Sequence, residues 1–181
     1  MNNNEVVKNE IDIDNNDENI DEQELAISDK ILQVVSFSLL NEVEYGIDIL
    51  SIYEILKNID ITRLPNTPVF VKGLINLRGS VIPIVNVRLR FGYKETKITD
   101  DSRIIVVGIN GKLVGLLVDK VFQVYRIPLK DINSPSELIE GVSSEFIQGV
   151  GRLKDRLLII LKLDNIVFVE QSLSEKNSID I

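Results

Sequence analysis

The sequence of 181 residues contains no histidine and no cysteine. Without them the chain has no imidazole general base, no thiol nucleophile, no disulfide and none of the usual ligands of a structural zinc site. An active site would have to be built from Asp, Glu, Lys, Ser or Tyr alone, as in some glycosidases. We therefore expect no catalytic residues, no metal and no cofactor.

Long apolar runs are also missing. Hydrophobic residues make up 44% of the chain, but charges interrupt them before any run reaches the roughly 18 residues that a membrane-spanning helix needs. The N-terminus lacks the basic start and the apolar stretch of a secretory signal. We expect a cytoplasmic protein with one domain, or one compact unit of two small joined barrels.

Negative charge is concentrated at the N-terminus. Residues 1–24 hold nine acidic residues and one lysine, a net charge of −8, which is also the net charge of the whole chain. With seven asparagines and few large apolar residues, this segment buries too little surface to offset the entropy of ordering it. We predict a disordered acidic tail over 1–28, a folded domain over 29–170 and a flexible C-terminus over 171–181; the tail serves solubility or docking.

From Ile31 onward the chain is rich in Ile, Val and Leu, with Gly, Pro, Asn or Asp about every ten residues. This rhythm is typical of short strands and predicts an all-β fold with minor helix, built as small antiparallel barrels. The expected strands are Leu32–Leu39, Tyr45–Ile55, Val81–Val87, Arg103–Ile109, Lys112–Val118, Val121–Arg126, Gly149–Leu153 and Leu157–Leu163.

Two hairpins and one helix are expected. Asn110-Gly111 fits a type I′ turn, which places Ile109 opposite Lys112 and Val107 opposite Val114 in two central strands. A second hairpin is predicted across Lys154-Asp155. A helix is predicted over Asp164–Leu173, where the aspartate is a candidate N-cap.

The segment from residue 63 to residue 97 is basic, with seven Lys or Arg residues and one Glu. This excess suits an acidic or anionic partner, or else belongs to a solvated face balanced by distant acids. Within it, Gly73 and Gly79 are interpreted as the ends of a loop whose single charged residue is Arg78. Ordinary turn glycines with an exposed arginine are the alternative.

Pro83 cannot donate a ladder hydrogen bond, so the strand around it is expected at a sheet edge or at a bulge. Beyond it, apolar and polar residues alternate from Val85 to Phe91, the pattern of a half-buried strand. A helical turn over Val87–Phe91 is the other possibility.

At these residues the sequence resembles the CheW-like family of bacterial chemotaxis coupling proteins. The resemblance is carried by the run from Phe70 to Gly79 followed by Ile82-Pro83-Ile84-Val85, by the run from Glu44 to Leu50, and by Leu64-Pro65-Asn66-Thr67-Pro68. It continues through the run from Val118 to Val121 to the hairpin that ends at Leu163, and so covers about Ile31–Phe168.

The resemblance implies two intertwined, SH3-like, five-stranded β-barrels and a scaffold that performs no chemistry. Such a protein connects the cytoplasmic tips of chemoreceptors to the regulatory domain of the histidine kinase CheA, in arrays at the membrane, without inserting into the membrane. Contacts with further copies in rings remain open.

Family positions carry over residue by residue. The resemblance implies that Ile49, Ile52, Glu54 and Val121 line a groove for the receptor's helical hairpin, with Gly73 and Arg78 beside it; for Ile49 and Ile52, burial in the core is the alternative. It implies kinase contacts at Asn133 and Leu138.

Two positions depart from the family pattern. Asn133 stands where some relatives have a basic residue, which puts the electrostatic part of the kinase contact in doubt. Asn86 stands where the family usually has aspartate, so a local ion pair is expected to be missing.

Two other functions are open. A small barrel with the basic segment 63–97 could bind nucleic acid, although its three aromatic residues are few for base stacking and the acidic tail would repel phosphates. A carboxylate enzyme could use Asp48 with Asp119, or Asp100 with Asp101; loop and turn acids are the alternative.

Overall fold

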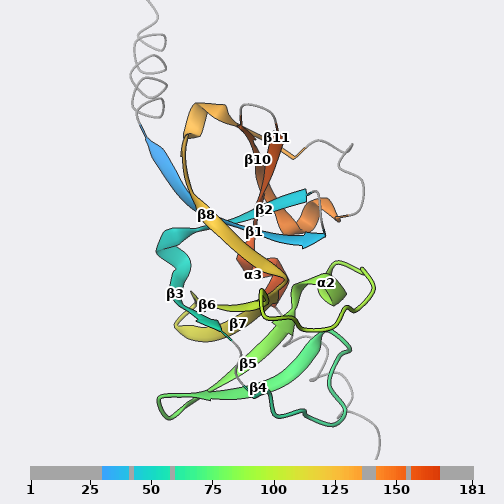
Figure 1. Ribbon diagram of the computed structural model, residues 1–181. Coiled ribbons are helices and arrows are strands. Elements are labelled where there is room, and N and C mark those ends of the chain that lie inside the picture. Colours follow the sequence, from blue (N-terminus) through green and yellow to red (C-terminus); the bar gives the residue numbers. More distant parts are fainter. Residues whose placement is uncertain (1–29, 41–42, 58–59, 136–141, 154–155, 168–181) are drawn as a thin grey trace, which may run out of the picture.

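The computed structural model describes residues 30–40, 43–57, 60–135, 142–153 and 156–167, so the predicted tail and C-terminus lie outside the described residues. Its strands form two sheets (Figure 1). The first sheet has the order β8-β1-β2-β11-β10-β9 and the second the order β3-β6-β7-β5-β4.

Each sheet builds one barrel. The strands of the first barrel are β1 (Ile31–Leu40), β2 (Val43–Asp48), β8 (Lys120–Pro128), β9 (Ile132–Asn133), β10 (Ile147–Leu153) and β11 (Arg156–Leu161). Those of the second barrel are β3 (Ile52–Lys57), β4 (Val71–Leu77), β5 (Ser80–Asn86), β6 (Arg103–Ile109) and β7 (Lys112–Val118). The predicted mainly β, two-barrel fold is confirmed, with the two-residue β9 as a sixth strand of the first sheet.

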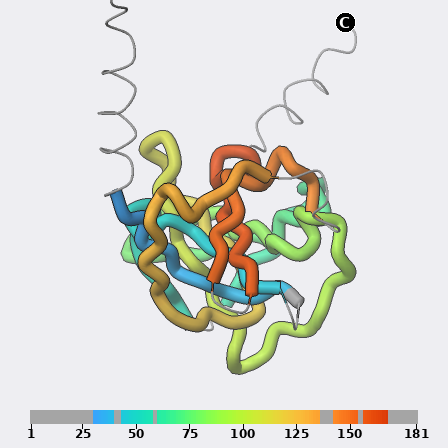
Figure 2. The backbone as a smooth tube through the Cα atoms, turned by 90° about the horizontal axis from the view of Figure 1, so that it is seen from above, coloured from blue at the N-terminus to red at the C-terminus, as the bar shows by residue number. Residues whose placement is uncertain are grey.

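The barrels are intertwined because the chain leaves the first sheet after β2, builds the second sheet with β3 to β7, and returns with β8. Figure 2 shows the early strands in blue beside the last strands in red, and β2 pairs with β11 in parallel. The single strand predicted over Tyr45–Ile55 was wrong. It breaks at Asp48, whose Oδ1 accepts a hydrogen bond from the Leu50 amide and caps the short 3₁₀ helix η1 (Ile49–Ser51).

The Asn110-Gly111 hairpin is confirmed in its position and register. Ile109 pairs with Lys112 and Val107 with Val114, and both turn residues have positive φ. Strands β6 and β7 are interior strands of the second sheet, as their apolar sequences predict. At the C-terminal end, β10 and β11 pair as expected on either side of residues 154–155.

The interpretation of Gly73–Gly79 as a loop was wrong. Residues 71–77 form β4, which pairs with β5 through a tight turn at Arg78-Gly79, where φ is 52° and 90°. Pro83 lies in an interior strand, but the ladder of β5 with β7 begins only at Ile84, so its missing N–H is tolerated. A bulge does occur beside it, in the register of β4 with β5.

The short helix after β5 follows from its cap. Asn86 ends β5, and its Oδ1 accepts a hydrogen bond of 3.2 Å from the Leu89 amide, which starts α2 (Val87–Arg90). The helical turn, rather than a continued strand, is therefore the correct alternative. The helix predicted at Asp164 is α3 (Leu163–Val167), in which Asp164 lies in the first turn and is not the N-cap. The remainder of that prediction lies outside the described residues.

Buried residues form three clusters. Val34, Ile127, Leu158 and Ile160 fill the first barrel, and a second cluster around Ile84 fills the second barrel. The largest cluster lies between the barrels and combines residues of both, for example Phe37 with Ile105. Because this central layer belongs to both sheets, the two barrels form one unit.

Candidate protein-binding surface

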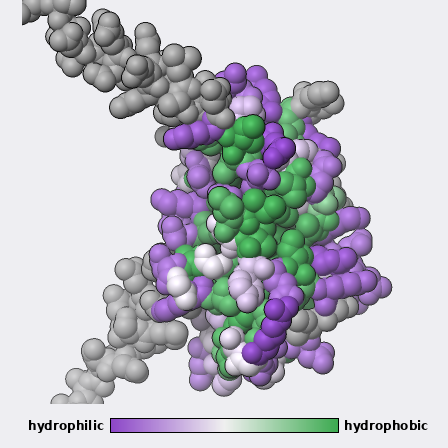
Figure 3. Space-filling model, turned by 90° about the vertical axis from the view of Figure 1, so that its left-hand side faces the viewer, coloured by the Kyte–Doolittle hydropathy of each residue, from purple (hydrophilic) through white to green (hydrophobic). Residues whose placement is uncertain are grey.

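One margin of the layer between the barrels reaches the molecular surface. Ile52 pairs with Val107, and Ile55 with Ile105, so both point to the inter-barrel side of the second sheet. Val121 pairs with Phe37 on the same side of the first sheet. Figure 3 shows this side, which carries β3 in Figure 1, as a broad hydrophobic area.

We name the inter-barrel surface by its residues Ile49, Ile52, Ile55, Val121 and Val124. Three of them, Ile49, Ile52 and Val121, are positions that the resemblance assigns to the receptor groove, and each is partly buried. Ile52 and Val121 also pack against the central core cluster. Core packing and surface exposure are thus both features of these residues.

Val124 belongs to this surface but was not predicted from the sequence. It is 47% exposed. It pairs with Val35, which in turn pairs with Ile47, so all three side chains point to the inter-barrel side. On η1, Leu50 was missed too and is 90% exposed. The β8 register, which contains a bulge, decides this placement, and residue types alone carry no signal of it.

Glu54 and Arg78 lie together at the edge of this region. The Arg78 guanidinium donates to Glu54 Oε1 at 3.2 Å, from the β4–β5 turn to β3. These strands are the two edges of the second sheet, so barrel closure brings together two residues that are 24 positions apart. Arg78 remains 72% exposed, and its guanidinium is available to a partner.

Gly73 lies close to this pair in sequence but has another role. It is buried in β4 with φ of 140°, and a Cβ there would lie 2.1 Å from the Thr62 carbonyl oxygen. The neighbouring Leu74 exchanges two backbone hydrogen bonds with Thr62, which follows β3. Gly73 therefore permits the close backbone approach that closes the second barrel. Because glycine has no side chain, it gives a partner no side-chain contact.

Of the two kinase positions, only Asn133 lies among the described residues. Asn133 is exposed on the short strand β9, where it pairs with Val150 of β10. Leu138 lies outside the described residues. The assignment of these positions to a kinase contact remains a prediction.

Several charges of the basic segment 63–97 have partners inside the protein. Lys72 pairs with Glu95, Arg78 with Glu54, and the buried Arg88 with Asp119 at 3.0 Å. Arg90 donates to the carbonyl oxygens of Asn165 and Ile166, and its guanidinium stacks over Phe70 and Phe146. Four of the seven cations of the segment are thus engaged within the protein, two of them with acids from outside the segment, which weakens the case for nucleic-acid binding.

Neither acidic pair forms a catalytic arrangement, since Asp100 and Asp101 are exposed and Asp101 pairs with Lys120 at 3.6 Å. Asp48 caps η1 and pairs with Val34 of β1. The backbone amide of Asp119 donates to the carbonyl oxygen of Ser38, four residues after Val34 on β1. Residues four positions apart in a strand are separated by about 13 Å, so Asp48 and Asp119 lie beside distant points of β1. Burial raises the pKa of Asp119, and the neighbouring Arg88 guanidinium opposes this shift. Among the described residues, no group of three or more acidic side chains could hold a metal ion.

The described part of the chain contains no helix with the length and apolar character needed to cross a membrane.

Comparison with known proteins gives a consistent result. Residues 33–170 match the model of the CheW-like domain. The chain is 37% identical over 140 residues to the chemotaxis protein CheW of Helicobacter pylori, covering 77% of this chain and 84% of that protein. It is 31% identical to CheW of Bacillus subtilis over 75% of this chain and 87% of that protein.

Among solved structures, the scaffolding protein TtCheW from Thermoanaerobacter tengcongensis is similar, with a TM-score of 0.73 and 38% identity. The match covers 78% of this chain and 95% of that chain. Sequence and fold comparisons therefore agree over the same two-barrel region.

Proposed function

The chain belongs to the family of CheW-like domains, and from this membership we propose that it is a non-enzymatic chemotaxis scaffold that couples chemoreceptors to the histidine kinase CheA. In this role it binds the cytoplasmic tips of receptors and the regulatory domain of the kinase at the same time. It is a cytoplasmic protein that joins arrays at the membrane through these contacts.

The observation that carries the proposal is the inter-barrel surface with the Glu54–Arg78 pair at its edge. It combines partly exposed aliphatic side chains from β3 and β8 with an exposed guanidinium. A receptor hairpin with an apolar stripe and a flanking polar or acidic group would bury the former and pair with the latter.

In this proposal the kinase contact lies elsewhere on the protein. Asn133 is on β9, which follows the C-terminal end of β8 and pairs with β10, whereas Val121 and Val124 lie in the N-terminal half of β8. Two partners could therefore bind at once, which a coupling protein requires. Because asparagine carries no charge, this contact would depend on hydrogen bonds and on nearby apolar residues.

The proposal is tested by co-sedimentation of the purified full chain with receptor signalling fragments and CheA. We expect the wild-type protein to enter the pellet with both partners. The variant Arg78→Asp would place a carboxylate beside Glu54, and we expect it to lower assembly by about tenfold or more. Its fold should be retained, because the Arg78 side chain is 72% exposed.

Lys97→Asp is the matched control, since it makes the same charge change at another exposed position of the basic segment. We expect it to assemble as the wild type does. Absence of wild-type binding to either partner would refute the function, whereas equal assembly of both variants would refute only the role of Arg78.

A further inference from the structure

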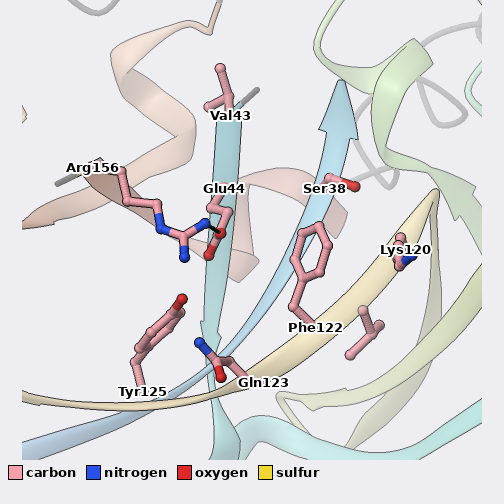
Figure 4. Close-up of a pocket in the computed structure, with 9 residues that line it drawn as sticks. Ser38, Val43, Glu44, Lys120, Phe122, Gln123, Tyr125 and Arg156 are labelled. Atoms are coloured by element: carbon pink, nitrogen blue, oxygen red, sulfur yellow. Dashed lines mark hydrogen bonds and ion pairs between the residues drawn. The ribbon is translucent and has the colours of Figure 1, made fainter. Parts of the chain in front are cut away.

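The open end of the first barrel holds a pocket that shares only Val121 with the inter-barrel surface. It is a hollow of about 460 Å³ next to the ends of β1, β2, β8 and β11 (Figure 4). Its side chains include Ser38, Glu44, Phe122, Tyr125 and two cations, Arg156 and Lys120, of which Lys120 pairs with Asp101 at 3.6 Å. Barrel mouths are common places for ligand binding.

Glu44 forms the inner wall of this pocket. It pairs with Ser38 on β1 and with Leu158 on β11, and Leu158 belongs to the core of the first barrel. Since directly paired residues share a face of the sheet, the Glu44 carboxylate points into the barrel end. Its side chain is only 10% exposed.

The two carboxylate oxygens of Glu44 differ. Oε1 is paired with the Arg156 guanidinium, whereas Oε2 is buried without a hydrogen-bond partner among the described residues. An ionised carboxylate accepts only, with about four lone-pair sites. A buried acceptor without a donor destabilises the folded protein, so an N–H group from outside the described residues that donates to Oε2 would be stabilising.

A bulge in β8 supplies the aromatic wall. Val35 pairs with Val124 and Phe37 with Val121, so Phe122 and Gln123 stand together opposite the single residue between them on β1. Both line the pocket, and Phe122 is 46% exposed. Bulges at barrel rims redirect side chains in this way.

From this combination we propose that the mouth of the first barrel is a second recognition site, which takes an arginine side chain of a partner protein. The guanidinium would donate to Glu44 Oε2 and stack on the Phe122 ring. A planar cation with several donors suits both an acceptor-only carboxylate and an aromatic face.

The approach to Oε2 is gated by side chains at the rim. Arg156 is 59% exposed, and Gln123 is exposed as well. Figure 4 shows Gln123, Tyr125 and Arg156 around the Glu44 carboxylate. A rotation of Gln123 or Arg156 would open Oε2, and Oε1 could keep its pairing with Arg156 while Oε2 accepts from the incoming group.

The test is an NMR titration of the ¹⁵N-labelled full chain with N-acetyl-arginine amide as the probe. We expect saturable shifts of the Ser38, Gln123 and Tyr125 amide signals, with a dissociation constant on the order of millimolar, since one charge-assisted hydrogen bond and one stacking contact are formed. N-acetyl-norleucine amide, which has no donor at the end of its side chain, should give no such shifts.

Two variants and one control locate the site. Glu44→Gln and Phe122→Ala should each weaken binding, the former by about tenfold because a charged acceptor is lost. Gln33→Ala changes an exposed residue of β1 on the opposite side of the sheet and should bind as the wild type does. Phe122 is half exposed, so its variant remains informative even if Glu44→Gln fails to fold.

Three results would show that the pocket is not an arginine site. They are no saturable shift with the arginine probe, equal binding of N-acetyl-lysine amide, and equal binding by Phe122→Ala. Free L-arginine that bound more than about tenfold tighter than the capped probe would indicate a free amino-acid ligand and would contradict a protein partner. None of these readouts involves the receptor or CheA, so failure here and failure of the coupling function are distinguishable.

Discussion

Replacing Arg78 by asparagine is expected to make the protein slightly more stable and a weaker coupler. Arg78 is the first central residue of the two-residue β4–β5 turn and has φ of 52°. Turns with positive φ at both central positions favour Asn-Gly. The chain has that sequence at another tight hairpin, Asn110-Gly111, where φ is 49° and 76°. Arg78→Asn would give both hairpins the same turn sequence.

The size of the effect follows from two opposing contributions. A left-handed backbone costs a residue other than glycine roughly 1–2 kcal/mol, and asparagine tolerates it better than arginine does. Against this gain stands the loss of the Glu54–Arg78 pair, which spans 3.2 Å with Arg78 72% exposed. Exposed pairs contribute about 0.2–1 kcal/mol. We expect a net increase in the free energy of unfolding of about 0.5 kcal/mol.

The assay is urea unfolding of four proteins, namely the wild type, Arg78→Asn, Glu54→Gln and the double variant. In the Glu54→Gln background no ion pair remains to be lost, so Arg78→Asn should stabilise more there, by about 1 kcal/mol. The same four proteins are then compared by co-sedimentation with receptor fragments and CheA. Both proteins that carry the Arg78→Asn substitution should assemble less.

A decrease in the free energy of unfolding of more than about 1 kcal/mol for Arg78→Asn would refute this reasoning, because an exposed ion pair cannot account for so large a loss. Equal effects in both backgrounds would show that the Glu54 contact contributes nothing. Undiminished assembly would remove Arg78 from the recognition surface.

Three further changes test the core. Gly73→Ala should lower the free energy of unfolding by about 3 kcal/mol or more in urea titration, since its Cβ would lie 2.1 Å from the backbone of Thr62. Gly79→Ala also has positive φ but no atom within 4 Å of the added Cβ, so it should lower the free energy of unfolding by less. Asp119→Asn should cost about 2 kcal/mol, because it leaves the buried Arg88 guanidinium without its carboxylate, and an unchanged urea midpoint would contradict this. Burial raises the pKa of Tyr45, so above about pH 10 the unfolded state loses a proton that the folded state keeps. The free energy of unfolding of the wild type should therefore fall by up to about 1.4 kcal/mol per pH unit. Tyr45→Phe, compared with the wild type by unfolding at about pH 9 to 11, should show a smaller fall.

Local features of the fold were predictable where sequence dictates backbone geometry at short range. Asn110-Gly111 fixed both the turn and the register of β6 with β7, because few other residues adopt two successive left-handed conformations. By contrast, Arg78-Gly79 forms a turn of the same kind with an unfavourable first residue. This dipeptide carries no turn signal of comparable strength, so the sequence predicts a loop where the structure has β4.

The site was predictable in part. Family positions indicated Ile49, Ile52, Glu54, Arg78 and Val121, and the structure brings Glu54 and Arg78 into contact. Gly73 could be recognised as a special backbone position, but its partner Thr62 could not, since their contact arises from closure of the barrel.

Sequence alone was enough to establish the β class, the Asn-Gly hairpin and the absence of histidine and cysteine chemistry. These are properties of composition and of neighbouring residues, which act over a few positions along the chain. Tertiary contacts were needed to show which charges of the basic segment are paired, that Val124 faces the inter-barrel side, and that Glu44 lies in a barrel mouth. Each depends on strand register and barrel closure, where one bulge in β8 changes which side chains meet, and distant segments set that geometry together.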